Sequence, residues 1–201
     1  MDNRLMKQIS GPIEEFNKNI RKFAGEKVRK EVMADSEKAI ASADLGKISI
    51  WLKEAIDRLD TLTSTGESED IMKSCGSSCF SVNKKHAEKD RERRLGCSTE
   101  EEYLKQVLLS GSGQGTRFEK DGNILVEYYT PKTYREDMQL RCYCLFASRL
   151  PEDMTISRTF CQCSRAHVEN YWKYVLDRPV RVELGETALT GAEECKFIIH
   201  L

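Results

Sequence analysis

The sequence predicts an α+β fold in which a helical N-terminal half packs on a mostly antiparallel sheet with an inserted C-terminal helix. Apolar residues recur every three or four positions in the first half, which is typical of amphipathic helices, and alternate in the second half, which is typical of strands. The dipeptide Asp121-Gly122 separates two alternating segments and is a strong hairpin signal. We therefore divide the chain into a helical region (1–110) and an α+β region (111–201), which together form one unit.

The helical region contains two amphipathic stripes and a later helix start. The first stripe covers residues 5–23, and Pro12 lies within it, so we expect a kink or a restart at that point. A stronger stripe covers residues 48–62 and is followed by the polar residues 63–68, which are typical of a linker. Residues 98–101, Ser-Thr-Glu-Glu, fit a capping box that begins a further helix.

The α+β region is predicted from alternation and from one late helical stripe. A helix is expected over residues 165–176, before the last two strands. In one of the strands Cys142 and Cys144 alternate in phase with apolar residues, so we expect these two cysteines to be core residues. The predicted strands cover residues 116–120, 123–130, 140–146, 180–184 and 195–201.

Composition limits the classes of function. The chain has 201 residues with 32 basic and 33 acidic side chains, and this balance argues against nucleic acid as the main partner. No stretch approaches the roughly 20 consecutive apolar residues of a membrane span. The N-terminal residues have no apolar run long enough for a signal peptide. We therefore expect a cytoplasmic protein whose thiols are kept reduced.

Eight cysteines form the most informative pattern in the chain. Six of them occur as close pairs with one or three residues between, and reduced thiols in small local sets are what a soft metal ion requires. Burial of uncharged thiols is the alternative explanation. Lone Cys97 is expected to be incidental. The candidate metal ligands are Cys75, Cys79, Cys161, Cys163 and Cys195. Zinc is the expected ion, with an iron–sulfur cluster as the alternative, because both accept thiolate ligands.

Two cysteine pairs have spacings with a physical meaning. On a helix, the three-residue gap between Cys75 and Cys79 brings both sulfur atoms to one face, where they can share a metal. Cys161 and Cys163 are expected just before the C-terminal helix, whose free amides would stabilise thiolates. His167, four residues after Cys163, would then lie on the same side and could act as a base.

The C-terminal segment resembles the 4-vinyl reductase domain family, in which a cysteine precedes a helix, an Arg-Pro-Val type strand follows, and a last cysteine comes after it. The matching residues are Phe160-Cys161-Gln162-Cys163-Ser164-Arg165-Ala166-His167, Arg178-Pro179-Val180-Arg181-Val182-Glu183 and Thr190-Gly191-Ala192-Glu193-Glu194-Cys195-Lys196-Phe197. Cys161 matches the family's first cysteine and Cys195 its last, while Thr187 stands where the middle cysteine is expected.

The resemblance implies a small-molecule-binding domain with a ligand pocket, related in fold to transport-particle subunits and haem-NO-binding domains. It also implies metal binding by the cysteines, with Cys163 or the Cys75/Cys79 pair supplying the sulfur that Thr187 lacks. Region 111–201 is accordingly expected to be the small-molecule-binding-like part of the chain.

Three functions follow from these patterns. The first is a binding module in which a cysteine-ligated metal and a pocket hold a small, partly apolar ligand. The second is a metal-free, cysteine-dependent hydrolase of a small cyclic or thio compound, with Cys161 or Cys163 as nucleophile and His167 as base. The third is a scaffold or sensor subunit that uses its amphipathic helices for assembly, for example as a homodimer.

Overall fold

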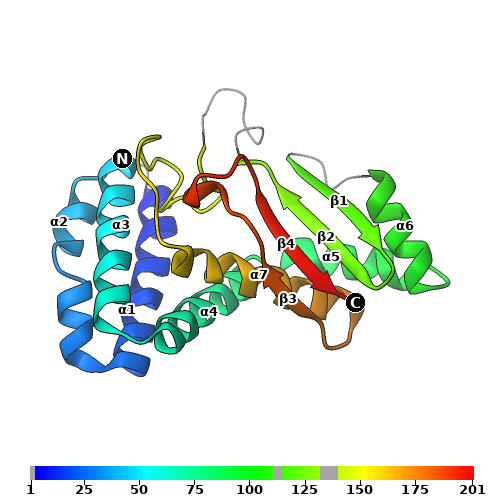
Figure 1. Ribbon diagram of the computed structural model, residues 1–201, viewed down its shortest axis with the longest axis horizontal. Coiled ribbons are helices and arrows are strands. Elements are labelled where there is room, and N and C mark those ends of the chain that lie inside the picture. Colours follow the sequence, from blue (N-terminus) through cyan, green and yellow to red (C-terminus); the bar gives the residue numbers. More distant parts are fainter. Residues whose placement is uncertain (1–2, 111–114, 132–139) are drawn as a thin grey trace.

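The computed structural model describes residues 3–110, 115–131 and 140–201 and has the α+β fold that the sequence predicts (Figure 1). Most of the helices precede the sheet in the chain, and one long helix follows the first hairpin. The helices are α1 (Asn3–Val32), α2 (Ser36–Ala41), α3 (Leu45–Leu62), α4 (Thr65–Val82), α5 (Lys85–Leu95), α6 (Glu100–Ser110) and α7 (Arg158–Leu176). The strands are β1 (Thr116–Asp121), β2 (Ile124–Tyr129), β3 (Arg181–Leu184) and β4 (Cys195–His200), with the short 3-10 helix η2 (Ala188–Thr190) between the last two.

The sheet has the strand order β1-β2-β4-β3, and every neighbouring pair is antiparallel. Its first hairpin turns at Gly122, whose positive φ of 53° is a conformation that glycine adopts without strain. Phe197 and Ile199 alternate on β4 and are both buried, which confirms the predicted face of the last strand.

α7 connects the two ends of the molecule. In Figure 1, α1 to α3 form one end and the sheet forms the other, while α4 and α7 run between them. α7 packs against α4 along one side and against α5 and β3 on others. Its central Trp172 is 1% exposed and belongs to the continuous core. α7 therefore contributes to the contact between the helical half and the sheet, and α6 adds a second contact through β1.

The crossing of α4 and α7 requires a glycine. A Cβ atom added to Gly76 would overlap the backbone carbonyl oxygen of Cys163 and would lie 2.9 Å from the Cβ of Ala166. Asn170 extends the contact by donating to the hydroxyl of Ser77 over 3.1 Å. The backbones of the two helices therefore approach closely at the point where Cys75 and Cys163 are found.

Replacement of Gly76 by alanine is expected to lower the free energy of unfolding by about 1–3 kcal/mol, because the helices must separate to admit the methyl group. Gly66→Ala, in the first turn of the same helix, is the matched control. Nothing lies within 4 Å of the added Cβ there, so this variant should be neutral or slightly stabilising. Urea unfolding of both variants measures the difference, and equal stabilities would contradict the close crossing.

The first helix differs from its prediction in the position of its break. Helical structure continues through Pro12, and the non-helical residue is Gly25, with φ 83° and ψ 174°. Pro12 is exposed, whereas its neighbours Ile13 and Phe16 are buried, so their packing helps the helix to continue past the hydrogen bond that proline removes. The expected restart of the helix at Pro12 is therefore wrong, and glycine's freedom at positive φ explains why the backbone leaves the helical conformation at Gly25.

Both helix starts that polar residues indicate are present, with small shifts. Ser64 caps α4 through a capping box with Glu67, so the expected linker over 63–68 is reduced to residues 63 and 64. At α6 the hydroxyl of Thr99 accepts from the amide of Glu102 over 3.1 Å, and the Glu102 carboxylate accepts from the Ser98 amide over 2.8 Å.

The segment 140–147 is a series of turns, so the predicted strand at this position is wrong. Leu140 and Phe146 are buried as expected. Arg141 fixes the turns, because its guanidinium donates to the carbonyl oxygen of Met154 over 2.6 Å and also to that of Pro151. The backbone of the segment pairs within itself, since the amide of Arg141 donates to the carbonyl oxygen of Ser148 and that of Ala147 to the carbonyl oxygen of Cys144.

The C-terminal helix begins earlier than predicted. α7 starts at Arg158, after Ser157, whose hydroxyl accepts from the amide of Thr159 over 3.3 Å. Cys161 and Cys163 therefore lie inside the first two turns of the helix and do not precede it. This position, and the side of the helix on which each sulfur lies, determines the arrangement of the thiols.

Candidate functional site

All eight cysteines are free thiols, and seven of them gather where α4, α7, the turns at 140–147 and the start of β4 meet. We divide them into two groups by the elements that surround them, although Cys142 and Cys144, which fall in different groups, are in contact through the amide of Cys144. The three-thiol group consists of Cys142, Cys161 and Cys195, and the four-thiol group consists of Cys75, Cys79, Cys144 and Cys163. The eighth, Cys97, donates a hydrogen bond to the Arg93 carbonyl oxygen within its own helical segment and belongs to neither group.

The three-thiol group is assembled around η2. The thiol of Cys161 donates to the hydroxyl of Thr187 over 3.4 Å, and the next amide in the chain, that of Ala188, donates to the sulfur of Cys195 over 3.3 Å. Cys142 is brought to the same place by its neighbour Arg141, which donates to the Ala188 carbonyl oxygen over 3.4 Å. Two consecutive residues thus hold Cys161 and Cys195 side by side.

The four-thiol group is assembled on the crossing of α4 and α7. Cys75 and Cys79 are one turn apart on α4, on one helix face, as the spacing predicts. The backbone of Cys163 touches Gly76, one residue from Cys75. Cys144 lies in the turns, where its carbonyl oxygen accepts from the amide of Ala147 over 3.1 Å.

Helix geometry separates the two cysteines of α7. Residues two positions apart on a helix differ by roughly 200° around its axis, so Cys161 and Cys163 cannot serve one ion from the same face. Cys161 accordingly lies beside Thr187, whereas Cys163 lies beside α4. The predicted set of five ligands is therefore divided between the two groups, with Cys161 and Cys195 in one and Cys75, Cys79 and Cys163 in the other.

Cys142 and Cys144 are the thiols that pattern reasoning assigned to structure alone. Their alternation with apolar residues imitates a strand, although the segment forms turns. The sequence nevertheless contained a signal that these two cysteines belong with the candidate ligands, because the Cys-x-Cys spacing occurs twice, at 142–144 and 161–163. Each Cys-x-Cys contributes one thiol to each group.

Burial keeps these thiols protonated in the absence of a metal. It raises the pKa of Cys75 and of Cys161 to about 12, against an ordinary value of 9.0, although hydrogen bonds from Asn19 and with Thr187 lower both. The pKa of Cys163 is raised further above its ordinary value by burial and then by the charges of nearby thiolates, Cys144 first. The helix-end stabilisation expected for Cys161 and Cys163 is thus outweighed by desolvation.

N–H groups already point at most of the sulfur atoms. Amides donate to Cys142 from Cys144 over 3.4 Å and to Cys195 from Ala188 over 3.3 Å. Side-chain amides donate to Cys75 from Asn19 over 3.3 Å and to Cys79 from Asn83 over 3.5 Å. Such donors stabilise the thiolate form and are the outer-shell contacts that metal-bound sulfur receives.

The thiols are neighbours without yet surrounding an ion. Within residues 3–110, 115–131 and 140–201, no three His, Cys, Asp or Glu side chains are placed so that they could hold one metal ion. A metal would have to displace the protons and draw the sulfur atoms of a group together. Thiolate is a donor type that zinc and iron–sulfur clusters accept, but the present spacing of these sulfur atoms is that of protonated, separately packed thiols.

His167 is half-buried on α7 and packs edge-on against Phe80, with ring centroids 5.8 Å apart. Burial lowers its pKa, so the imidazole is neutral at pH 7. Its Nδ1 atom has no hydrogen-bond partner among the described residues, and no contact with the thiol of Cys163 is present there. The expected nucleophile–base pair is therefore not assembled.

One hollow of about 220 Å³ adjoins the three-thiol group. Its lining includes Arg141, which precedes Cys142, and Ala188, whose amide donates to Cys195. Glu152 and Glu193 make part of its wall acidic. None of its lining residues is a cysteine, so the hollow adjoins the thiols through their neighbours and does not contain them.

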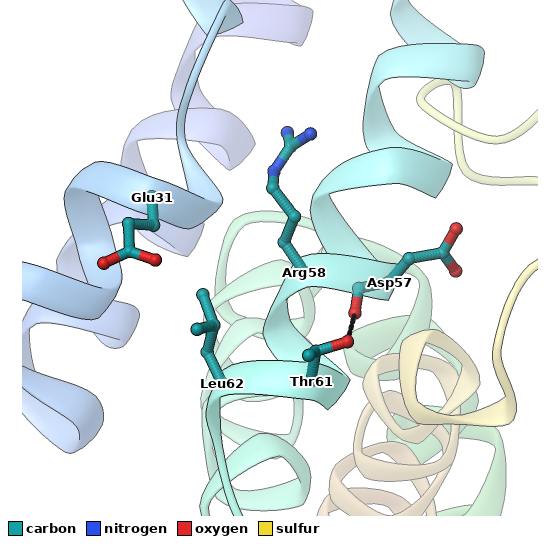
Figure 2. A pocket seen from close by; sticks show the side chains of 5 residues that line it. All are labelled: Glu31, Asp57, Arg58, Thr61 and Leu62. Atoms are coloured by element: carbon teal, nitrogen blue, oxygen red, sulfur yellow. Dashed lines mark hydrogen bonds between the residues drawn. The ribbon is translucent and has the colours of Figure 1, made fainter.

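A second hollow, of about 280 Å³, lies between α1 and α3 and is shown in Figure 2. Its lining residues are Glu31, Asp57, Arg58, Thr61 and Leu62, none of which is a thiol. Arg58 joins α3 to α1 by donating to the carbonyl oxygen of Val32 over 3.1 Å. Within α3, the hydroxyl of Thr61 donates to the carbonyl oxygen of Asp57 over 2.8 Å. These groups are engaged in joining helices, and the hollow has no link to the cysteines.

Comparison with protein-family models, curated proteins and solved structures finds no significant match to this chain. The resemblance to the 4-vinyl reductase domain family therefore stays a prediction. In the described part of the chain, no helix is long and apolar enough to cross a membrane.

Proposed function

We propose that this chain is a small-molecule-binding zinc protein whose metal is held by the three-thiol group. The proposal rests on two hydrogen bonds, which hold Cys161 at Thr187 and Cys195 at the next residue, Ala188. Ala188 also lines the hollow of about 220 Å³. Three protein thiolates leave the fourth position of a tetrahedral zinc free for an external ligand. A thiol or another small donor that enters the hollow would occupy that position.

The protonation of the thiols favours this function over a thiol hydrolase. A cysteine nucleophile needs a lowered pKa and a base in contact, whereas burial raises the pKa of Cys161 to about 12. Zinc reverses this situation, because it displaces the proton and stabilises the thiolate directly. Zinc uptake should therefore release protons and should weaken as the pH falls.

Cobalt(II) substitution tests the open position, since its visible spectrum reports the ligands around the ion. Protein purified without oxygen or chelator and loaded with cobalt should change its spectrum when a small external thiol is added. Cys161→Ser should abolish this response, while Cys97→Ser, outside both groups, should retain it. A spectrum that no added donor changes would contradict an open site.

Elemental analysis and native mass of the same preparation identify the metal and the oligomeric state. We expect zinc. Iron with acid-labile sulfide would instead establish the iron–sulfur alternative, since the same thiolates would bind it.

Alkylation gives a second test. Cys195, a proposed ligand, and Cys97, which belongs to neither group, are both half-buried thiols. In metal-loaded protein Cys195 should resist iodoacetamide, and a chelator should make it reactive without altering the rate at Cys97. Equal labelling of Cys195 with and without chelator would show that no metal covers it.

A further inference from the structure

The two edges of the sheet differ in whether their backbone groups are covered. On β3 the amide of Gly185 bonds to a carbonyl oxygen of β4 over 2.7 Å, which fixes the alternation of this pair of strands. The peptide groups of Val182 and Leu184 therefore point away from β4. Two arginines of α7 cover them, since Arg165 donates to the Val182 carbonyl oxygen over 3.0 Å and Arg158 donates to that of Leu184. The edge at β3 is thus closed to another strand.

In the described part of the chain, the edge at β1 has no such cover. The amide of Thr130 donates to the carbonyl oxygen of Gly115 over 2.7 Å, which fixes the alternation between β1 and β2. The peptide groups of Thr116, Phe118 and Lys120 therefore point away from β2. Among the residues that the structure describes, none bonds to the backbone amide or carbonyl group of these three on that side. β1 thus presents a row of unpaired donors and acceptors, to which a further strand can be added.

The helices leave the plane of the sheet beside β1 open. Lys120 points to the covered face of β1 and forms an ion pair with Glu101 of α6 over 3.2 Å. On the same face Phe118 packs edge-on against Trp172 of α7, with ring centroids 5.9 Å apart. α6, which is beside β1 in Figure 1, therefore approaches the strand from the face that α7 covers. An added strand would lie in the plane of the sheet, outside β1.

The sequence of β1 is self-complementary when two copies of the strand run antiparallel. A two-fold axis at Phe118 places Thr116 opposite Lys120 of the second copy, so every outward peptide group meets another. On the exposed face, the same register places Arg117 opposite Glu119 of the second copy, on both sides of the axis. A shift of the pairing by two residues would instead oppose Arg117 to Arg117 or Glu119 to Glu119. The charges therefore select one register.

We propose that this protein forms a two-fold symmetric dimer in which β1 pairs with β1 of a second copy. The two four-stranded sheets then become one continuous sheet. A second copy is the favoured occupant of this edge, because it supplies the matched charges at Arg117 and Glu119 together with the matching row of peptide groups. No thiol lies on β1, so the dimer goes beyond the proposed zinc site and is tested separately from it.

Reversal of one charge at a time tests the pairing. Arg117→Glu and Glu119→Arg each place like charges opposite one another on both sides of the axis, so each variant should dimerise about tenfold more weakly than the wild type. An equimolar mixture of the two variants should restore the dimer, because each chain then meets the opposite charge. The variant that carries both changes should also dimerise. Glu183→Arg, the matched reversal on β3, should leave the dimer unchanged.

Sedimentation equilibrium measures these differences, and the wild type should approach twice the chain mass of 23.1 kDa as its concentration rises. A wild type that stays monomeric at every concentration would overturn the proposal. A dimer that neither single reversal weakens would also overturn it, since another surface would then form the interface.

Amide hydrogen exchange of the wild type locates the interface without any variant. The amides of Thr116, Phe118 and Lys120 should become protected as the protein concentration rises, whereas those of Val182 and Leu184 on the covered edge should not change. Dimerisation without added protection on β1 would contradict the pairing of these strands. Protection that appears only after an extended peptide is added would also overturn the dimer, in favour of a different partner at this edge.

Discussion

Removal of zinc is expected to lower the melting temperature of this protein by about 10 °C or more. A ligand present at 1,000 times its dissociation constant stabilises the folded state by about 4 kcal/mol, and each kcal/mol shifts the melting temperature by about 2–4 °C in a domain of this size. The effect should be large because the proposed ligands lie in three separate parts of the chain, α7, β4 and the turns at 140–147, which a bound ion would hold together. Structural zinc stabilises only the state in which its ligands are assembled.

Calorimetry or circular dichroism before and after treatment with a chelator measures this shift. Chelator that has been saturated with calcium is the control for effects of the reagent itself. Adding zinc back should restore the original transition. Equal melting temperatures with and without metal would rule out a structural role for the thiol groups.

Replacement of Glu127 by glutamine is expected to stabilise the protein above pH 7 by up to roughly 3 kcal/mol. Glu127 is 4% exposed on β2, and its carboxylate accepts from the indole N–H of Trp172 over 2.9 Å. Burial raises its pKa from 4.5 to about 7, although the bonds from Trp172 and Tyr129 lower it. The carboxyl group is thus held in its neutral form by the core around it.

The sign of the pH dependence follows from that shift. Below pH 4.5 the folded and unfolded states both bind the proton, so the contribution of Glu127 to stability is fully present. Between pH 4.5 and 7 only the unfolded state releases the proton, so the stability falls as the pH rises. Above the folded pKa both states are ionised and the loss is complete. Glutamine cannot ionise, yet its carbonyl oxygen can still accept from Trp172.

Urea unfolding of the variant and the wild type at pH 5 and pH 8, with equal metal content, isolates this contribution. The stability difference should be small at pH 5 and should favour the variant at pH 8. Glu186→Gln changes an exposed carboxyl group and should give no such pH-dependent difference. The same difference at both pH values would show that Glu127 is ionised throughout.

Periodicity predicted most of the fold because burial of one face determines it. The alternation around Asp121-Gly122 and along β4, and the stripe of α3, each correspond to an element with the expected buried face. The break in α1 and the start of α7 were misplaced, because both depend on local choices that packing overrides. A proline on an exposed face can be tolerated, and a serine cap can extend a helix before its apolar stripe begins.

The division of the thiols could not be predicted from spacing. It depends on how far α7 extends toward its N-terminus, since a Cys-x-Cys in a loop can converge on one ion but a Cys-x-Cys in a helix cannot. It also depends on the turns at 140–147, which Arg141 holds through bonds to distant carbonyl groups. The pairing of Cys75 with Cys79 was predictable, because the helix and its period are both local properties.

The two cysteines of α7 make this helix a mechanical link between chemically different places. A helix moves as a rigid rod, so any rotation that carries the sulfur of Cys161 toward η2 carries the sulfur of Cys163 in the opposite sense, relative to α4. In the proposed metal-bound form, a molecule that pulled on the ion near η2 would therefore apply a torque at the crossing with α4, and the helices at the other end of the molecule would respond to it through α7.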